Sequence, residues 1–395
     1  MKRFNYSMGV ALLLGVGIGF LDLSLVQKGA AIIATVFVKM LKLISLPMIF
    51  LAIVSTVTQI TSLIETGRII KKILKYTLLT TLIAATIGFL LFVILQPVQT
   101  EEVTLNSIQI QGNYLTFFLK IIPDHLMQPF MDNNVLGMSF LAAVFSCAVL
   151  KLPTSQSALL RDFFKALFDA LLKITTALMR LMPIGVFAFT IEFMHHLREG
   201  KEHVNRLLLY ASCVVGANLI QGFIVLPLFL KLKGHFPWRA ASKMFPALTM
   251  AFFSKSSSAT LPLTLSCAKE RLGVSSKTAD FALPLCSIIN MNGCAAFILI
   301  TLFFVSSSEG MVWTIGEMIP WIALSTLAAI GNAGVPMGCF YLATAFLMGM
   351  GISIKQMGMI LPLYSFFDML ETALNVWSDS CVTLVVDREL INRNS

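Results

Sequence analysis

The stretch that decides the fold class is Asp368-Met-Leu-Glu371-Thr372-Ala-Leu-Asn375-Val-Trp-Ser-Asp379, a run of ionisable and amide side chains in an otherwise apolar segment. At about 100° per residue, its polar members share one helical stripe roughly 100° wide. A carboxylate at the centre of a bilayer costs roughly 2.5–3.5 kcal/mol. Three carboxylates on one face therefore require a cation, a substrate or a basic partner.

The composition places this stripe in a membrane protein. The 395 residues are 57% hydrophobic and 12% charged, about half the charged fraction of a soluble domain, and the mean hydropathy is +0.84. The net charge of +9 comes from basic residues in short loops between apolar segments, which favours positive-inside orientation over nucleic-acid binding. We expect an all-α polytopic protein of the cytoplasmic membrane, in contact with lipid and not with nucleic acid. The lack of a long extracellular insert agrees with a prokaryotic origin.

Catalysis and metal binding find little support in the sequence. The seven cysteines include no CxxC pair, so we expect neither a disulfide framework nor a zinc site. His195, His196 and His203 lie in a mixed-charge stretch without a carboxylate framework, where solvated histidines are commoner than ligands. The sequence contains no phosphate-binding loop or nucleophile–base set that stands out. We expect no enzyme and no cofactor apart from a coupling ion.

Apolar segments alternate with short polar stretches over the first 230 residues. We expect membrane helices over 8–23, 30–60, 76–96, 135–150, 163–194 and 207–230, with a less regular apolar region from 117. The basic cluster Arg68, Lys71, Lys72 and Lys75 indicates the cytoplasmic side. The loop after Pro97 contains acidic but no basic residues, which fits the opposite side.

The pattern changes between about 237 and 356, where three apolar segments are interrupted by polar and small residues. The interruptions are Lys255-Ser-Ser-Ser-Ala-Thr-Leu-Pro262, Asn290-Met-Asn-Gly-Cys294 and Gly331-Asn-Ala-Gly-Val-Pro-Met-Gly338. Broken helices are tolerated at membrane depth only where the backbone is buried in protein or lines a polar cavity. Two interrupted segments flanking a broken helix predict paired re-entrant hairpins around a binding site. Close helix packing by Ser and Gly is the alternative for any one of them.

These motifs, taken together, resemble the dicarboxylate/amino acid:cation symporters, the glutamate transporter family. The resemblance rests on the three interruptions, on the stripe from Asp368 to Asp379, and on Phe37-Val-Lys-Met-Leu-Lys-Leu-Ile-Ser-Leu-Pro47 and Tyr76-Thr-Leu-Leu-Thr-Thr81. It covers nearly the whole chain, with the motifs in the family's order. It implies eight transmembrane helices plus two re-entrant helical hairpins, in a homotrimer of elevator-type transporters.

The resemblance also implies a division of the chain, which forms a single transporter unit over 1–395. Residues 1–70 and 133–232 would be mainly scaffold and trimerisation helices. Residues 71–98 and 237–388 would be mainly transport domain, with hairpins near 239–270 and 320–352.

Site residues follow from the resemblance in two sets. Those expected to meet the substrate are Ser256, Ser257, Ser258, Cys294, Val335, Asp368, Glu371, Thr372 and Asn375. Those expected to bind sodium, partly through backbone carbonyls, are Thr80, Thr81, Asn290, Met291, Asn292, Ile330, Asn332, Asn375 and Asp379. Asp368 would hold the substrate's α-ammonium group and Asp379 a cation, for which hard oxygen ligands are suited.

The chain departs from the family pattern at several of these positions. Asn292 stands where the family has Asp, which weakens the case for a cation there. Ala329 and Asn332 replace hydroxyl residues of the second hairpin. Glu371 stands where members for acidic substrates carry an Arg that pairs with the substrate's side-chain carboxylate. An anion in place of a bidentate donor reverses the charge preference at this position. The substitution therefore predicts a neutral or cationic amino acid as substrate, rather than glutamate or aspartate.

Lys255 offers a second interpretation, because a serine-rich hairpin tip would bring it near the same cavity. A pair with Glu371 or with Asp368 would then be structural. We expect a symporter that takes up an amino acid or dicarboxylate with Na⁺, or with H⁺ because a buried Glu371 could titrate. The alternative is an uncoupled channel-like or sensor relative of the same fold.

Overall fold

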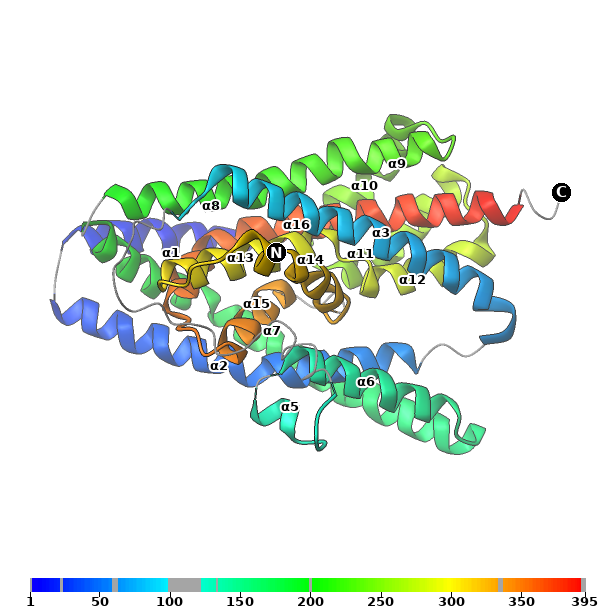
Figure 1. The fold of residues 1–395 in the computed structure, drawn as a ribbon, viewed down its shortest axis with the longest axis horizontal. Helices are drawn as coiled ribbons and strands as arrows, with labels where there is room; N and C mark the ends of the chain where they lie inside the picture. The colour runs from blue at the N-terminus through cyan, green and yellow to red at the C-terminus, as the bar shows by residue number, and fades with distance from the viewer. Residues whose placement is uncertain are drawn as a thin grey trace.

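The structure is a computed structural model that describes residues 2–21, 24–58, 63–98, 122–132, 134–198, 201–332 and 337–391. Every regular element in these segments is helical (Figure 1). The elements are α1 (Lys2–Phe20), α2 (Ser24–Val57), α3 (Leu63–Leu95), α5 (Gln128–Met131), α6 (Val135–Leu150), α7 (Thr154–Arg198), α8 (Lys201–Ile220), the π-helical η1 (Gln221–Val225), α9 (Leu226–Leu232), α10 (Pro237–Ser254), α11 (Ser257–Ser266), the π-helical η2 (Cys267–Leu272), α12 (Ser276–Ile289), α13 (Asn292–Ser308), α14 (Ile315–Ile330), α15 (Gly338–Gly349) and α16 (Lys355–Ile391).

Several helices extend beyond the apolar segments that predicted them. The basic cluster from Arg68 to Lys75 lies in the first turns of α3 and not before the helix, and His195 and His196 lie in α7 and not in a loop. Lys, Arg and Glu are good helix formers, so a helix can continue past the end of its apolar run. Hydropathy alone therefore places the starts of several helices too late in the chain.

By length and composition, three of the described helical stretches could each cross a membrane. They are Ile69–Leu95, Val204–Leu232 and Ser276–Ser308, and the last contains the break between α12 and α13. The eight spans and two re-entrant hairpins stay a prediction.

Large apolar side chains face outward along much of the surface. Leu25, Leu43, Ile94 and Leu228 are examples of exposed side chains. Large exposed apolar patches mark interaction or membrane surfaces, and a bilayer would cover these side chains.

The helices pack in two groups. Helix α7 contacts α1 and α2, and α2 contacts α6; α2 and α6 lie along one long side of the molecule in Figure 1. Helix α13 contacts α3, α8, α15 and α16, while α10 and α12 pack on α16. The approach of α3 to α13 is close: a Cβ added to Gly88 would lie 3.3 Å from the Cα of Ala296. This second group contains the interrupted helices.

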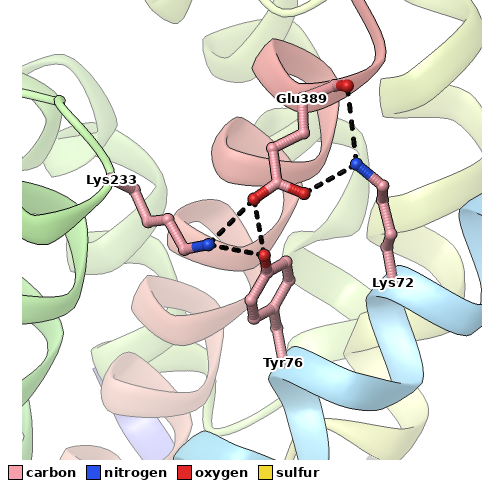
Figure 2. Close-up of polar contacts among 4 residues, drawn as sticks. All are labelled: Lys72, Tyr76, Lys233 and Glu389. Atoms are coloured by element: carbon pink, nitrogen blue, oxygen red, sulfur yellow. Dashed lines mark hydrogen bonds and ion pairs between the residues drawn. The ribbon is translucent and has the colours of Figure 1, made fainter. Parts of the chain in front are cut away.

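A polar cluster joins three helix ends of the second group (Figure 2). Lys72 Nζ lies 2.6 Å from Glu389 Oε2, and Lys233 Nζ lies 2.9 Å from Glu389 Oε1. The Tyr76 hydroxyl donates to Glu389 Oε1 at 2.5 Å and accepts from Lys233 at 2.6 Å. Burial raises the pKa of Glu389, but the hydrogen bonds from the two lysines and the tyrosine lower it by more, to about 2. The cluster therefore holds the carboxylate ionised where α3, α9 and α16 meet.

Candidate functional site

The polar stripe of α16 faces the interior of the second group. Helix α16 runs unbroken through the whole stripe, and all six polar side chains from Asp368 to Asp379, Ser378 included, are buried. The periodicity argument from the sequence is thus confirmed for these positions. The stripe faces the break in the preceding chain segment.

That break falls at Asn290 and Met291, whose φ/ψ angles of −101/68° and −105/66° are not helical. The Asn290 amide donates to Asp379 Oδ1 at 3.0 Å and to Ser378 Oγ at 2.9 Å. The backbone N–H of Gly293 donates to Asn375 Oδ1 at 3.0 Å. One backbone N–H of the first turn of α13 is therefore satisfied by a side chain of α16.

Glycine at 293 permits this contact. A Cβ added there would lie 2.8 Å from Asn218 Oδ1 and 2.9 Å from the Cα of Glu371. Real Cβ atoms do not approach so closely, so any side chain at 293 would push α13 away from α8 and α16. The absence of a Cβ sets the spacing of the site.

Helix α3 contributes hydroxyl groups on the other side of the break. Thr80 Oγ1 lies 3.4 Å from Asn290 Oδ1, and Thr80, Thr81 and Asn292 are all buried. Within the described part of the chain, Thr81 Oγ1 and Asn292 Oδ1 have no hydrogen-bond partner. Buried polar atoms without a partner are rare in native proteins and often mark a site for a water or an ion.

Two residues of this region are structural partners that the sequence did not indicate. The Ser378 hydroxyl accepts a hydrogen bond from the Asn292 amide as well as from Asn290. Gln221, in the π-helical turn η1, donates to the backbone carbonyl of Thr80 at 3.0 Å. A π-helical insertion is frequent at functional sites, but no sequence motif announces this one.

A narrow polar cavity lies between the helix break, α16 and the tips of the two helix pairs. Its lining residues are Lys255, Ser257, Met291, Asn332, Cys339, Asp368, Glu371, Thr372 and Asn375. Most of them belong to the predicted substrate and cation sets, which the fold brings together from four segments. The serine-rich stretch predicted that Lys255 would lie near the cavity, whereas no sequence pattern predicted that Cys339 would line it.

The tip of the first pair, α10 and α11, turns at Lys255, which has left-handed backbone angles of φ 54° and ψ 32°. Lys255 Nζ donates to Ser365 Oγ at 2.5 Å and interacts electrostatically with Asp368. Ser256 caps α11 by accepting from the N–H of Ala259 at 3.2 Å. Ser257 lines the cavity, and Ser258 is exposed to the outside. Of the three serines, the structure therefore places only Ser257 in the cavity wall.

The second pair, α14 and α15, is described only in part at its tip. Val335 lies outside the described residues. Asn332 is buried, and its amide donates to Cys339 Sγ at 3.6 Å. The side chain of Ile330 lines a different, apolar cavity, so only its backbone remains a candidate ligand. Cys294 is buried next to the break but does not line the polar cavity.

A polar cavity inside an apolar bundle, bounded by a broken helix and two helix-pair tips, is typical of secondary transporters, in which such breaks hold substrate and ions. The chain belongs to the sodium:dicarboxylate symporter family, whose model matches residues 4–389. It is therefore a membrane transporter and not an enzyme.

Animal transporters are among its relatives. The chain is 28% identical to excitatory amino acid transporter 3 of Mus musculus over 412 residues, which cover 89% of this chain and 78% of the mouse protein. It is 27% identical to the Oryctolagus cuniculus transporter of the same name, over 96% of this chain and 84% of that protein. Neutral amino acid transporter B(0) of Rattus norvegicus is 30% identical over 63% of this chain and 45% of that protein. The relatives leave the expected prokaryotic origin untested.

Proposed function

We propose that the protein is a Na⁺-coupled symporter of the cytoplasmic membrane for an amino acid that is not acidic. The observation that carries this proposal is the position of Glu371, a carboxylate in the wall of a buried cavity next to a second carboxylate, Asp368. A dicarboxylate in that cavity would place like charges together in a medium of low dielectric constant, which is costly.

Sodium has oxygen ligands available on either side of the helix break. Asp379 supplies a charge, Asn375 an amide oxygen, and the break supplies backbone carbonyls. The buried oxygens of Thr81 and Asn292, unpartnered within the described residues, support a second sodium position together with Thr80 and Asn290. The backbone from Ile330 to Asn332, with Met291, is proposed as a third.

For the substrate, we propose that Asp368 binds the α-ammonium group, with Thr372 and Asn375 completing the polar lining. The α-carboxylate would be met by the hairpin tips near Ser257 and Val335. Neutral amino acid transporter B(0) is named for a neutral substrate, which supports a non-acidic amino acid as a substrate class within the family.

We also propose homotrimers with an elevator motion, in which the second helix group moves against the first. An apolar cavity of about 430 Å³ lies between α2 and α6 on one side and α3, α12 and α14 on the other, and would ease such sliding. Because α8 packs on α3 and α13, we propose that residues 201–232 move with the transport domain rather than with the scaffold expected from the sequence.

The test is uptake by the purified chain in proteoliposomes, under an imposed Na⁺ gradient or an imposed H⁺ gradient. We expect accumulation of at least one neutral or cationic amino acid above its external concentration with Na⁺ outside. Accumulation driven by the H⁺ gradient alone would show that the coupling ion is a proton and not sodium. Downhill flux that neither gradient accelerates would support the alternative, an uncoupled channel-like or sensor protein of the same fold. Na⁺-driven aspartate uptake that survives Glu371→Gln would contradict the proposed selectivity against acidic amino acids.

A further inference from the structure

Glu371 is an ionisable side chain whose partner the described protein does not supply. It is 1% exposed, and within the described segments neither carboxylate oxygen has a hydrogen-bond partner. A buried carboxylate is tolerated when it is paired or hydrogen-bonded. The carboxylate of Glu371 thus needs a group that enters the cavity.

The groups around Glu371 do not replace such a partner. The Cys339 thiol interacts with the Glu371 carboxyl group, but a thiol is only a weak hydrogen-bond donor and brings no positive charge. The amide of Asn375 donates to Met291 Sδ. Lys255 donates to Ser365 and interacts with Asp368, so its charge is engaged by the other carboxylate. Asp368 itself adds like-charge repulsion at Glu371.

The charges of the cavity wall indicate what would complete it. The described lining residues contain one ammonium group, on Lys255, and two carboxylates, on Asp368 and Glu371. The α-ammonium and α-carboxylate of an amino acid cancel. When these groups are counted without the coupling ions, which are the same for every substrate, a neutral side chain leaves one negative charge in the cavity and an acidic side chain leaves two. A cationic side chain leaves none.

We infer that the substrate is an amino acid with a cationic side chain, whose ammonium or guanidinium group pairs with Glu371. This inference rests on the proposed symport and narrows its substrate class. Asp368 and Glu371 are three residues apart on α16, so their Cβ atoms are neighbours at roughly 5–6 Å. A substrate with two separate cationic groups matches two carboxylates at that spacing, one for the α-ammonium and one for the side chain.

The experiment compares lysine with Nε-acetyl-lysine, which keeps the stem of lysine and removes its charge. Radiolabelled lysine uptake into proteoliposomes is measured under a Na⁺ gradient, with each compound as competitor. For the wild-type chain, we expect lysine and arginine to compete at least about tenfold better than Nε-acetyl-lysine, because a charge-assisted hydrogen bond is lost on acetylation. In Glu371→Gln that preference should fall to within about twofold.

A second readout avoids transport and controls for misfolding. The melting temperature of the detergent-solubilised chain is measured in the presence of Na⁺. We expect lysine to raise it in the wild type. In Glu371→Gln we expect glutamine to raise it and lysine to leave it unchanged. Accumulation of neutral amino acids without competition by excess lysine would overturn the inference and leave the symport standing. If uptake of neutral amino acids depends on pH in the wild type but not in Glu371→Gln, Glu371 binds a proton rather than a substrate cation, and the inference is likewise overturned. No accumulation of any amino acid under either gradient would overturn the proposed function itself.

Discussion

The side-chain amide of Asn290 donates a hydrogen bond to Asp379 Oδ1 over 3.0 Å, joining the break between α12 and α13 to α16. This contact fixes the orientation of the carboxylate that we propose as a sodium ligand. It also separates two properties of Asp379, because the hydrogen bond needs only an acceptor whereas a cation needs the charge.

Asp379→Asn is predicted to weaken sodium coupling strongly without unfolding the chain. The new amide oxygen still accepts from Asn290, but a neutral ligand recovers little of the ion's dehydration energy. We expect the Na⁺ concentration for half-maximal uptake to rise at least about tenfold, a change of roughly 1.4 kcal/mol. Asp280→Asn is the matched control, because Asp280 is paired with Lys269 on the exposed surface. An unchanged Na⁺ dependence in Asp379→Asn would show that the cation lies elsewhere.

Asn292→Asp is predicted to strengthen sodium binding. Asn292 Oδ1 is buried without a partner in the described structure, and a carboxylate there would add a charged ligand to the second proposed sodium position. The Ser378 hydroxyl, which now accepts from the Asn292 amide, can rotate to donate instead. Sodium titrations of uptake should shift to lower concentration. A shift to higher concentration would mean that the Asn292 amide, rather than its oxygen, is what the site requires.

Glu389→Gln is predicted to destabilise the protein at neutral pH, because Lys72 and Lys233 lose their shared counter-ion. We expect a loss of roughly 0.5–1 kcal/mol, a value for a partly exposed ion-pair network. The folded-state pKa of Glu389 is about 2, below the ordinary value of 4.5. Its stabilisation is therefore complete above about pH 4.5 and is lost as the pH falls towards 2. Thermal unfolding between pH 7 and pH 3 should show the wild type and the variant converging at the acidic end, and parallel curves would contradict the prediction.

Gly293→Ala is predicted to disrupt the site through packing alone. The added methyl group would meet Asn218 Oδ1 and the backbone of Glu371 at under 3 Å, and such overpacking costs roughly 1–3 kcal/mol. Gly316→Ala is the control, because a Cβ there meets no atom within 4 Å. The melting temperature and uptake rate should fall for the first variant and hold for the second. Equal behaviour of the two would show that α13 and α16 tolerate separation.

Helix α16 and the break at Asn290 illustrate what the sequence could predict. The stripe repeats with the period of a helix, and Asn-Met-Asn-Gly interrupts an apolar run, so both features are local in the chain. A buried polar face and a broken helix could each be predicted without knowledge of the fold, whereas their placement opposite each other was implied only by the family resemblance.

The contact between Asn292 and Ser378 shows where such prediction ends. The two residues are 86 positions apart, and their contact depends on how α13 and α16 are set against each other along their axes. Close packing at Gly293 constrains that setting and leaves no periodic pattern in the sequence. The π-helical turn at Gln221, which bonds to α3, leaves none either. The ends of α7 were missed for a different reason, because its polar first turns from Thr154 and the last turn that ends at Arg198 lie outside the apolar run.

The left-handed backbone of Lys255 has a consequence for how the gene can change. Glycine adopts that conformation without steric cost, whereas a residue with a Cβ pays roughly 1–2 kcal/mol for it. Replacing Lys255 by glycine would therefore relieve the backbone strain at this turn. The persistence of Lys255 would require selection on the ammonium group itself, at the point where the tip of the α10–α11 pair approaches Asp368 of α16. Comparing this position between chains that carry Glu371 and chains that carry an Arg there would reveal whether the two charges evolve as a pair.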